Sequence, residues 1–230
     1  DVAAGFLTML FGAMEELALG NPWDLATDIG PLISADAQIK VQDYVNKARH
    51  QGRLLKQLPV PTEGHFVGPA VIEVTGIADL EQEVFGPVLH IARFKAEDFA
   101  ATLDAINATG YGLTFGLHTR IDERVKAISA QLQTGNIYVN RNQVGAVVET
   151  QPFGGEGLSG TGPKAGGPRY VQRFTKPYRY SGDLPPAATV SLAEAQRLID
   201  ETHHPVPAAL MIQDMPGPTG ESNRLAVWPR

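Results

Sequence analysis

Cysteine is absent from the 230 residues of this chain. This absence excludes disulfides, thiolate metal sites and thiol nucleophiles together, so any catalysis by the chain alone would have to proceed without them. Long apolar runs are missing too: no stretch of about 18 apolar residues could span a membrane as a helix. No charged leader followed by an apolar stretch resembles a signal peptide either. We therefore expect no transmembrane segment.

An excess of positive charge is also missing. Lys and Arg number 19 against 25 Asp and Glu, and the formal net charge is −6. Surfaces that follow phosphates are usually basic, so we expect no nucleic-acid binding through this segment. The composition, 43% hydrophobic and 19% charged, is typical of neither disordered nor fibrous proteins and suits one buried core with an appendage.

Apolar residues at helical spacing begin at the second position and continue through Val2, Phe6, Leu10, Met14 and Leu17. Gly20-Asn21-Pro22 would end this helix. Because the chain starts with Asp1 instead of Met, apparently inside a helix, we expect a piece of a longer protein.

The middle of the chain alternates between strand and helix patterns. Ser34 is a plausible N-cap of a helix that Gly52 would end. Short apolar stretches follow at 53–57, 67–74 and 88–94, and their near-continuous hydrophobicity favours strands buried on both faces.

Further along, a helix is expected over about 96–107 and another after Thr119 as its N-cap, with strands at 113–118 and 136–140. This alternation predicts right-handed crossovers in a mostly parallel open sheet with flanking helices, which is the α/β class.

The pattern changes after residue 140. Residues 151–168 are rich in Gly and Pro without periodicity, which indicates a structured loop. A short helix at 169–174 and a strand at 175–181 follow. Ser191 to Glu194 form a capping box that opens a last helix through about Glu201. The remainder, from Pro205, is loosely patterned around a turn at 216–220.

Residues 155–160 match G-x-G-x-x-G, but the flanks argue against a dinucleotide fingerprint because Pro152 precedes and Pro163 follows where a strand and a helix are needed. A P-loop is excluded because Pro163 stands between the glycine and Lys164. What the loop offers is closely approachable backbone N–H groups and the Ser159 hydroxyl, a combination that can form a concave anion site. The alternative is a loop that only turns corners.

Glu83 and Phe85 lie just before the buried strand that begins at Val88. A carboxylate outside a strand end can accept two hydrogen bonds from the vicinal hydroxyls of a ribose. The alternative is a solvated glutamate at the end of a short helix.

Two other candidates fail. His203-His204 have no partner at metal-ligand spacing, and a solvated helix end explains them better. Ser159 is not a hydrolase nucleophile, because the Gly-x-Ser-x-Gly elbow is absent.

Over roughly residues 1–181, these segments together resemble the aldehyde dehydrogenase superfamily. The carrying residues are Gly20-Asn21-Pro22, Asp28-Ile29-Gly30-Pro31, residues 64–69, 83–87, 111–113 and 135–140, and Pro152-Phe153-Gly154-Gly155. A narrower resemblance, on residues 140–148, 151–168 and 216–221, is to the bifunctional proline-catabolic members. These couple an FAD-dependent proline dehydrogenase to an NAD-dependent L-glutamate γ-semialdehyde dehydrogenase.

The resemblance implies that Glu83 binds the nicotinamide ribose of NAD and that Phe85 packs beside the nicotinamide ring. Ser159 and Gly160, with Gly157 shaping the loop, would hold the α-carboxylate of the semialdehyde. No catalytic residue and no metal site are expected in this chain. The family's nucleophilic cysteine, general-base glutamate and Rossmann domain would lie upstream, so the chain alone is expected to be inactive. FAD would belong to a domain outside it.

The expected organisation has four parts: a catalytic-domain portion (1–140), a substrate-anchoring loop with a short helix (141–174), an oligomerisation strand (175–182) and a linker, helix and tail (183–230). The expected partners are glutamate semialdehyde, upstream NAD-binding and proline dehydrogenase domains, and further copies in a homo-oligomer. The resemblance implies a cytoplasmic bacterial protein, or one peripheral to the inner membrane in its full-length form.

Two alternatives remain. One is a non-enzymatic assembly module. The other is an aldehyde dehydrogenase for another substrate, against which residues 141–148 and the Ser159 loop both weigh.

Overall fold

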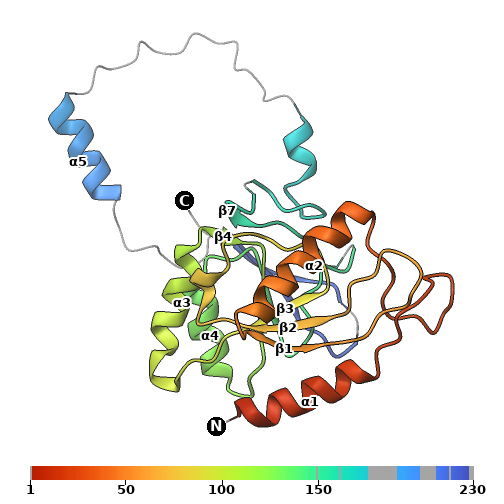
Figure 1. The fold of residues 1–230 in the computed structure, drawn as a ribbon. Coiled ribbons are helices and arrows are strands. Elements are labelled where there is room, and N and C mark those ends of the chain that lie inside the picture. The colour runs from red at the N-terminus through yellow and green to blue at the C-terminus, as the bar shows by residue number, and fades with distance from the viewer. Residues whose placement is uncertain are drawn as a thin grey trace. The chain divides into compact units, whose positions relative to one another are not determined.

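A computed structural model describes residues 2–148, 150–160, 162–175, 191–202, 211–217 and 219–227, without the side chains of 199, 201 and 202. The chain divides into two compact units, residues 1–109 and 110–230 (Figure 1). The predicted strand at 175–181 lies outside the described residues except for Thr175, and so do His203-His204.

The first unit opens with helix α1 (Ala3–Glu15), where a helix was predicted. The first part of its apolar face is uncovered, with Val2 86% and Phe6 58% exposed, whereas Leu10 is half-buried and Met14 is buried. Helical spacing of apolar residues therefore identified the helix, and the described chain buries only the later part of the face that the spacing defines.

Helix α2 (Ala35–His50) begins where the sequence indicated. The Ser34 hydroxyl accepts a hydrogen bond from the backbone N–H of Ala37 at 3.2 Å, which satisfies one of the free donors at the helix N-terminus. Gly52 follows the helix with φ +70°, so its position favours glycine. The buried face of α2 consists of Val41, Val45 and Ala48.

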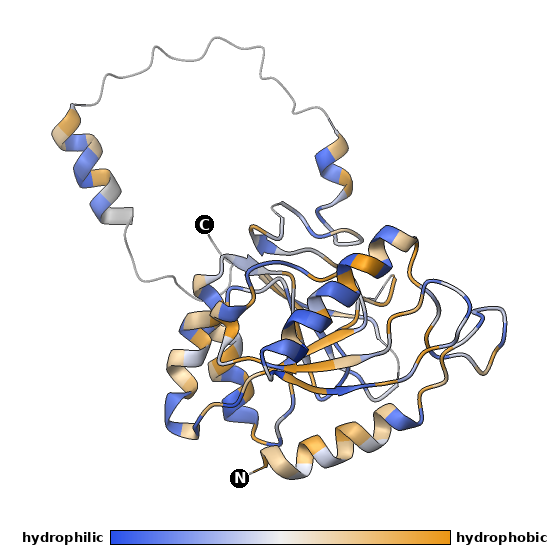
Figure 2. Ribbon diagram, viewed as in Figure 1, coloured by the Kyte–Doolittle hydropathy of each residue, from blue (hydrophilic) through white to orange (hydrophobic). Residues whose placement is uncertain are grey.

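This helix packs beside a three-stranded sheet of order β1-β2-β3, formed by β1 (Leu54–Gln57), β2 (Ala70–Glu73) and β3 (Val88–Ile91). β2 runs parallel to β3 and antiparallel to β1. Ala48, Ile72 and Val74 form the core, with Tyr44, Leu54 and Val88 packed against it. Figure 2 shows the orange, hydrophobic β2 at the centre of this sheet.

Two short 3₁₀ helices, η1 (Ile77–Asp79) and η2 (Ala96–Asp98), and helix α3 (Phe99–Ala108) complete the first unit. Leu103 is the buried residue of α3, as the predicted apolar face requires.

In the second unit, β5 (Thr114–Leu117) and β6 (Asn136–Val139) are parallel and joined through helix α4 (Asp122–Gln131). The predicted crossover is present, and with the first unit's sheet it confirms the α/β class. Thr119 is not the N-cap of α4, because the helix begins later, after Ile121. The Thr119 hydroxyl instead accepts a hydrogen bond from the Ile121 N–H at 3.3 Å, ahead of the helix.

The two-residue strands β4 (Tyr111–Gly112) and β7 (Glu156–Gly157) pair antiparallel. A short 3₁₀ helix η3 (Val171–Phe174) lies where a short helix was predicted. Helix α5 (Leu192–Thr202) opens with the predicted cap: the Ser191 hydroxyl accepts from the Glu194 N–H at 3.2 Å.

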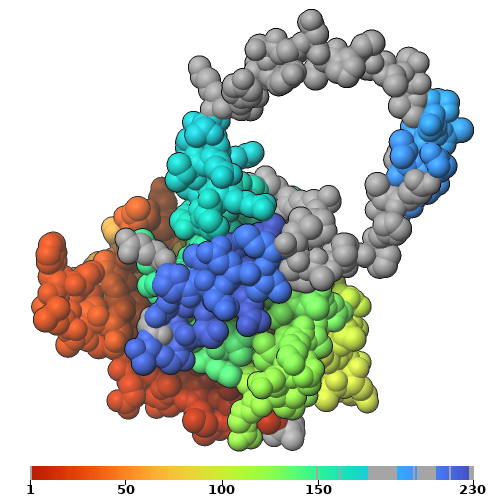
Figure 3. Space-filling view, turned by 180° about the vertical axis from the view of Figure 1, so that it is seen from behind, coloured from red at the N-terminus to blue at the C-terminus, as the bar shows by residue number. Residues whose placement is uncertain are grey.

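The tail after Pro205, expected to be loosely patterned, instead contains a hairpin of β8 (Met211–Met215) and β9 (Asn223–Val227). Arg141 forms an ion pair with Glu221 at 3.0 Å, and the Gln151 amide donates to the Asn223 side chain at 3.1 Å. Figure 3 shows the dark blue hairpin in front of green and teal parts of the same unit. These contacts explain the order of a segment whose own pattern is weak.

Candidate functional site

The glycine-rich loop after residue 150 is folded back on itself and on its neighbours. Phe153 and Ala165 exchange backbone hydrogen bonds of 3.0 and 2.9 Å, which closes the loop at its base. Further along, β7 pairs with β4, so that Glu156 lies opposite Gly112. The loop is therefore structured, as its sequence predicted.

Close backbone approach explains why glycines shape this loop. Gly157 has φ +57°, and a Cβ there would lie 2.4 Å from the Gly110 carbonyl oxygen. A Cβ on Gly135, at the start of the neighbouring β6, would lie 1.8 Å from the Gly154 carbonyl oxygen. Both contacts are shorter than any side chain can accept, so a substitution at either position must displace the loop.

Ser159 is half-buried on this loop, and its hydroxyl accepts a hydrogen bond from the Gly112 N–H at 2.9 Å. This bond fixes the oxygen but uses only a lone pair, so the hydroxyl hydrogen can still be donated to a ligand. The structure thus gives the predicted substrate-binding hydroxyl a defined position.

The backbone N–H groups around Ser159 already donate to carbonyl groups of the loop and of the neighbouring Gly110. The amides of Leu158, Ser159 and Gly160 donate to the carbonyls of Gly110, Glu156 and Gly157 at 2.8, 3.0 and 3.3 Å. The bond from Gly160 is the longest and the most easily exchanged for a ligand. An anion at this position could accept hydrogen bonds from the Ser159 hydroxyl and the Gly160 amide. The amides of Leu158 and Ser159 are less available, because they already donate to carbonyl groups.

Lys164 attaches the loop to β6 and to the residue before it, a role that the sequence did not predict. Its ammonium group donates to the Gly135 carbonyl and to the Asn136 side-chain oxygen, the latter at 3.3 Å. Asn136 also donates to the Pro152 carbonyl at 3.0 Å and accepts from the Gly154 N–H at 3.3 Å. No local pattern signals this role, because the partners of Lys164 are 28 and 29 residues away in sequence.

Burial lowers the pKa of Lys164 below its ordinary value, and the nearby Glu156 carboxylate acts in the opposite direction. Two neutral oxygen acceptors favour the protonated ammonium form. The loop therefore carries a partly buried positive charge.

In the first unit, Glu83 and Phe85 lie on the turn that leads into β3. Gly86 packs against Val41 of α2, and the Ala70 N–H donates to the Pro87 carbonyl at 2.9 Å, which fixes the end of this turn to β2. Phe85 is 78% exposed and Glu83 is exposed. Within the described parts of the chain, Glu83 forms no hydrogen bond or ion pair. An exposed ring beside an exposed, available carboxylate suits contact with a ligand.

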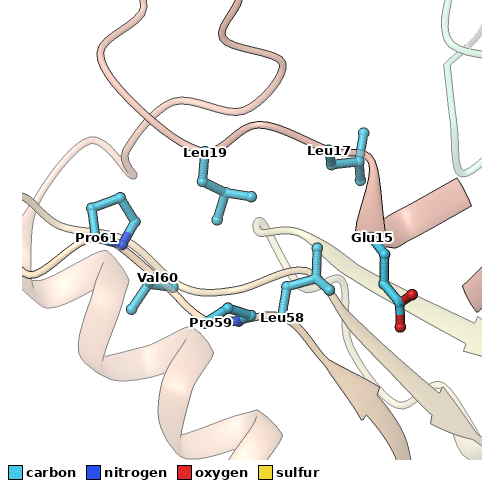
Figure 4. Close-up of a pocket in the computed structure, with 7 residues that line it drawn as sticks. All are labelled: Glu15, Leu17, Leu19, Leu58, Pro59, Val60 and Pro61. Atoms are coloured by element: carbon cyan, nitrogen blue, oxygen red, sulfur yellow. The ribbon is translucent and has the colours of Figure 1, made fainter. Parts of the chain in front are cut away.

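The first unit contains a hollow of about 420 Å³. Figure 4 shows the residues that line it, which are Glu15, Leu17, Leu19, Leu58, Pro59, Val60 and Pro61. Its one ionisable residue, Glu15, pairs with Lys56. None of the predicted site residues lines it.

The described residues hold no cluster of three or more histidine or acidic side chains that could bind a metal ion. No helix among them is both long and apolar enough to cross a bilayer.

Residues 1–178 match the model of the aldehyde dehydrogenase family. Across its whole length the chain is 40% identical to the bifunctional protein PutA of Salmonella typhimurium, of which it spans 20%. Among solved structures, a mutant of proline utilization A (PutA) from Bradyrhizobium japonicum matches with a TM-score of 0.72 and 50% identity, over 76% of this chain and 18% of that one.

A 1-pyrroline-5-carboxylate dehydrogenase from Thermus, solved with bound NAD, matches with a TM-score of 0.67 and 35% identity, over 75% of this chain and 34% of that one. The chain thus spans about a fifth of the curated PutA and about a third of the Thermus enzyme.

Proposed function

Because the chain belongs to the aldehyde dehydrogenase family, we propose that it forms the substrate-anchoring part of an NAD-dependent enzyme that oxidises L-glutamate γ-semialdehyde to L-glutamate in proline catabolism. The observation that carries this proposal is the position of the Ser159 hydroxyl, which accepts a hydrogen bond from the Gly112 N–H at 2.9 Å. The loop that carries it packs closely against neighbouring backbone because its glycines leave room. The similarity to PutA and to 1-pyrroline-5-carboxylate dehydrogenase supports the choice of substrate.

The reaction converts an aldehyde, NAD⁺ and water into a carboxylate, NADH and two protons. The proposed task of this chain is positioning. Ser159 and Gly160 hold the carboxylate at the far end of the substrate, which keeps the aldehyde carbon in place for attack. A misplacement of about 1 Å at a reacting centre can cost 100-fold in rate.

Glu83 and Phe85 are the proposed NAD contacts. The exposed Glu83 carboxylate accepts hydrogen bonds from the nicotinamide ribose, and the exposed Phe85 ring packs beside the nicotinamide. NAD, when bound, supplies the hydride acceptor. The NAD bound to the Thermus relative supports the use of NAD as the cofactor.

The nucleophile must come from outside this chain, since the chain contains no cysteine. We propose that the chain is inactive alone and acts within a parent that carries the cysteine, the Rossmann domain and an FAD-dependent proline dehydrogenase domain. The parent is proposed to be a homo-oligomer in the bacterial cytoplasm or at the inner membrane surface.

Replacement of Ser159 by alanine in the parent enzyme tests the proposal. The KM for glutamate semialdehyde should rise by about 10-fold or more, because a hydrogen bond to a charged group contributes about 1.5–3 kcal/mol. Oxidation of an aldehyde without a carboxylate should change less than about twofold. Ser129→Ala, on the exposed side of α4, is the matched control. Equal losses with both aldehydes would contradict carboxylate anchoring.

A further inference from the structure

The Ser159 loop carries a positive charge that the anchoring role described so far does not use. The Lys164 ammonium contacts two neutral oxygens, those of Gly135 and Asn136. Among the described residues it forms no ion pair, so its charge is not cancelled by a contacting carboxylate.

A partly buried charge without a counter-ion is costly to keep. A neutral side chain such as methionine would fill the same space without loss of hydration, whereas burial of an ammonium group carries a penalty of several kcal/mol that hydrogen bonds offset only in part. If the lysine served only to pin the loop, a neutral amide donor would do so at lower cost. The net charge is therefore the property that requires an explanation.

A short series of hydrogen bonds links this charge to the proposed anion site. The Lys164 ammonium donates to the Gly135 carbonyl, and the Gly135 N–H donates to the Gly112 carbonyl at 3.0 Å. The Gly112 N–H in turn donates to the Ser159 hydroxyl at 2.9 Å, so only two backbone residues separate the charge from that hydroxyl. In this partly dehydrated setting, charges act over longer distances than in water.

We propose that Lys164 is a specificity-determining residue: its partly buried charge makes the Ser159 loop favour aldehydes with a carboxylate over neutral aldehydes of the same length. This inference rests on the proposed function of the loop. Glu156, exposed on β7, lies close enough to act on Lys164 electrostatically and partly offsets its charge. Glu156 thus lowers the preference that Lys164 creates.

The test compares two aldehydes that differ only in the carboxylate, 5-oxopentanoate and pentanal, in the parent enzyme. Lys164→Met removes the charge and keeps the length of the side chain. It should lower kcat/KM for 5-oxopentanoate by about 10-fold relative to pentanal, as expected when one nearby charge is removed. Lys164→Arg should keep most of the preference. Lys126→Met, which removes an exposed and solvated charge from α4, should leave it unchanged.

Glu156→Gln provides a change of opposite sign. It should raise the preference for 5-oxopentanoate by about two- to threefold, because it removes a charge that opposes Lys164. A role in holding the loop together would not produce opposite effects in Lys164→Met and Glu156→Gln. The thermal midpoint of each variant shows whether the parent remains folded.

If Lys164→Met slows both aldehydes equally while Ser159→Ala still discriminates between them, the electrostatic role of Lys164 is overturned and the anchoring loop stands. If Lys164→Met and Ser159→Ala each slow both aldehydes equally, the proposed carboxylate-binding function of the loop is itself contradicted.

Discussion

The side chain of Asn140 pairs with the backbone of Thr119 as a strand residue would. Its Oδ1 accepts from the Thr119 N–H and its Nδ2 donates to the Thr119 carbonyl, each at 2.9 Å. Asn140 itself is in the left-handed region, with φ +56°. The asparagine therefore closes the β5–β6 pair at the point where the chain leaves β6 for the loop.

Substitution of Asn140 separates its backbone role from its side-chain role. Asn140→Gly keeps the favoured φ and loses the two hydrogen bonds, so it should destabilise the parent by about 1 kcal/mol. Asn140→Ala also carries the cost of a left-handed side chain and should destabilise by about 2 kcal/mol or more. Urea unfolding of both variants gives the comparison. Equal losses would show that the left-handed backbone contributes nothing.

Loss of the Glu83 carboxylate should impair NAD use without affecting the fold. Glu83 is exposed and makes no contact within the described residues that its removal would break. In the parent, Glu83→Ala should raise the KM for NAD or lower the hydride-transfer rate by about 10-fold, because a charge-assisted hydrogen bond is lost. Glu97→Ala, another exposed glutamate of the same unit, is the control. Unchanged kinetics with NAD would remove Glu83 from the site.

His90 makes the stability of the first unit depend on pH. Its Nε2 lies 2.8 Å from the Tyr44 hydroxyl, and the rings meet edge to face. Burial, assisted by the Arg53 charge, lowers the pKa of His90 below its ordinary value of 6.5. The unfolded chain therefore binds the proton more readily than the folded one. Stability is fully present above pH 6.5 and declines as the pH falls from there through the folded pKa.

A variant without the His90 imidazole isolates this contribution. His90→Gln cannot titrate, so its thermal midpoint should fall less than that of the wild type between pH 7.5 and pH 5, a range of about 2.5 units around the ordinary histidine pKa. The difference between the two proteins should shrink as the solution becomes acidic. A constant difference across this range would show that His90 titrates alike in the folded and unfolded chain.

Local signals predicted the parts of the fold that depend on neighbours in sequence. Ser34 and Ser191 cap their helices because a cap needs only a donor three residues away. Thr119 was predicted as a cap for the same reason, but Asn140, 21 residues later, engages its backbone, and α4 begins after Ile121. The long-range partner decided the local geometry.

Long-range contacts also explain what the sequence did not reveal. The β8–β9 hairpin has a weak pattern of its own and is tied down through Arg141 and Gln151, 80 and 72 residues away. The Lys164 contacts were hidden in the same way. Ser159 and Gly157, by contrast, stood out because hydroxyls and glycines in a loop suggest a geometric purpose even before the partners are known.

The absence of space above Gly135 affects how this protein can change over evolutionary time. Even a methyl group there would collide with the Gly154 carbonyl oxygen, so no single substitution of Gly135 leaves the loop in its place. A survey of environmental DNA could use this fixed glycine, together with the Asn136 that follows it, as a landmark for related reading frames whose surfaces have diverged beyond alignment.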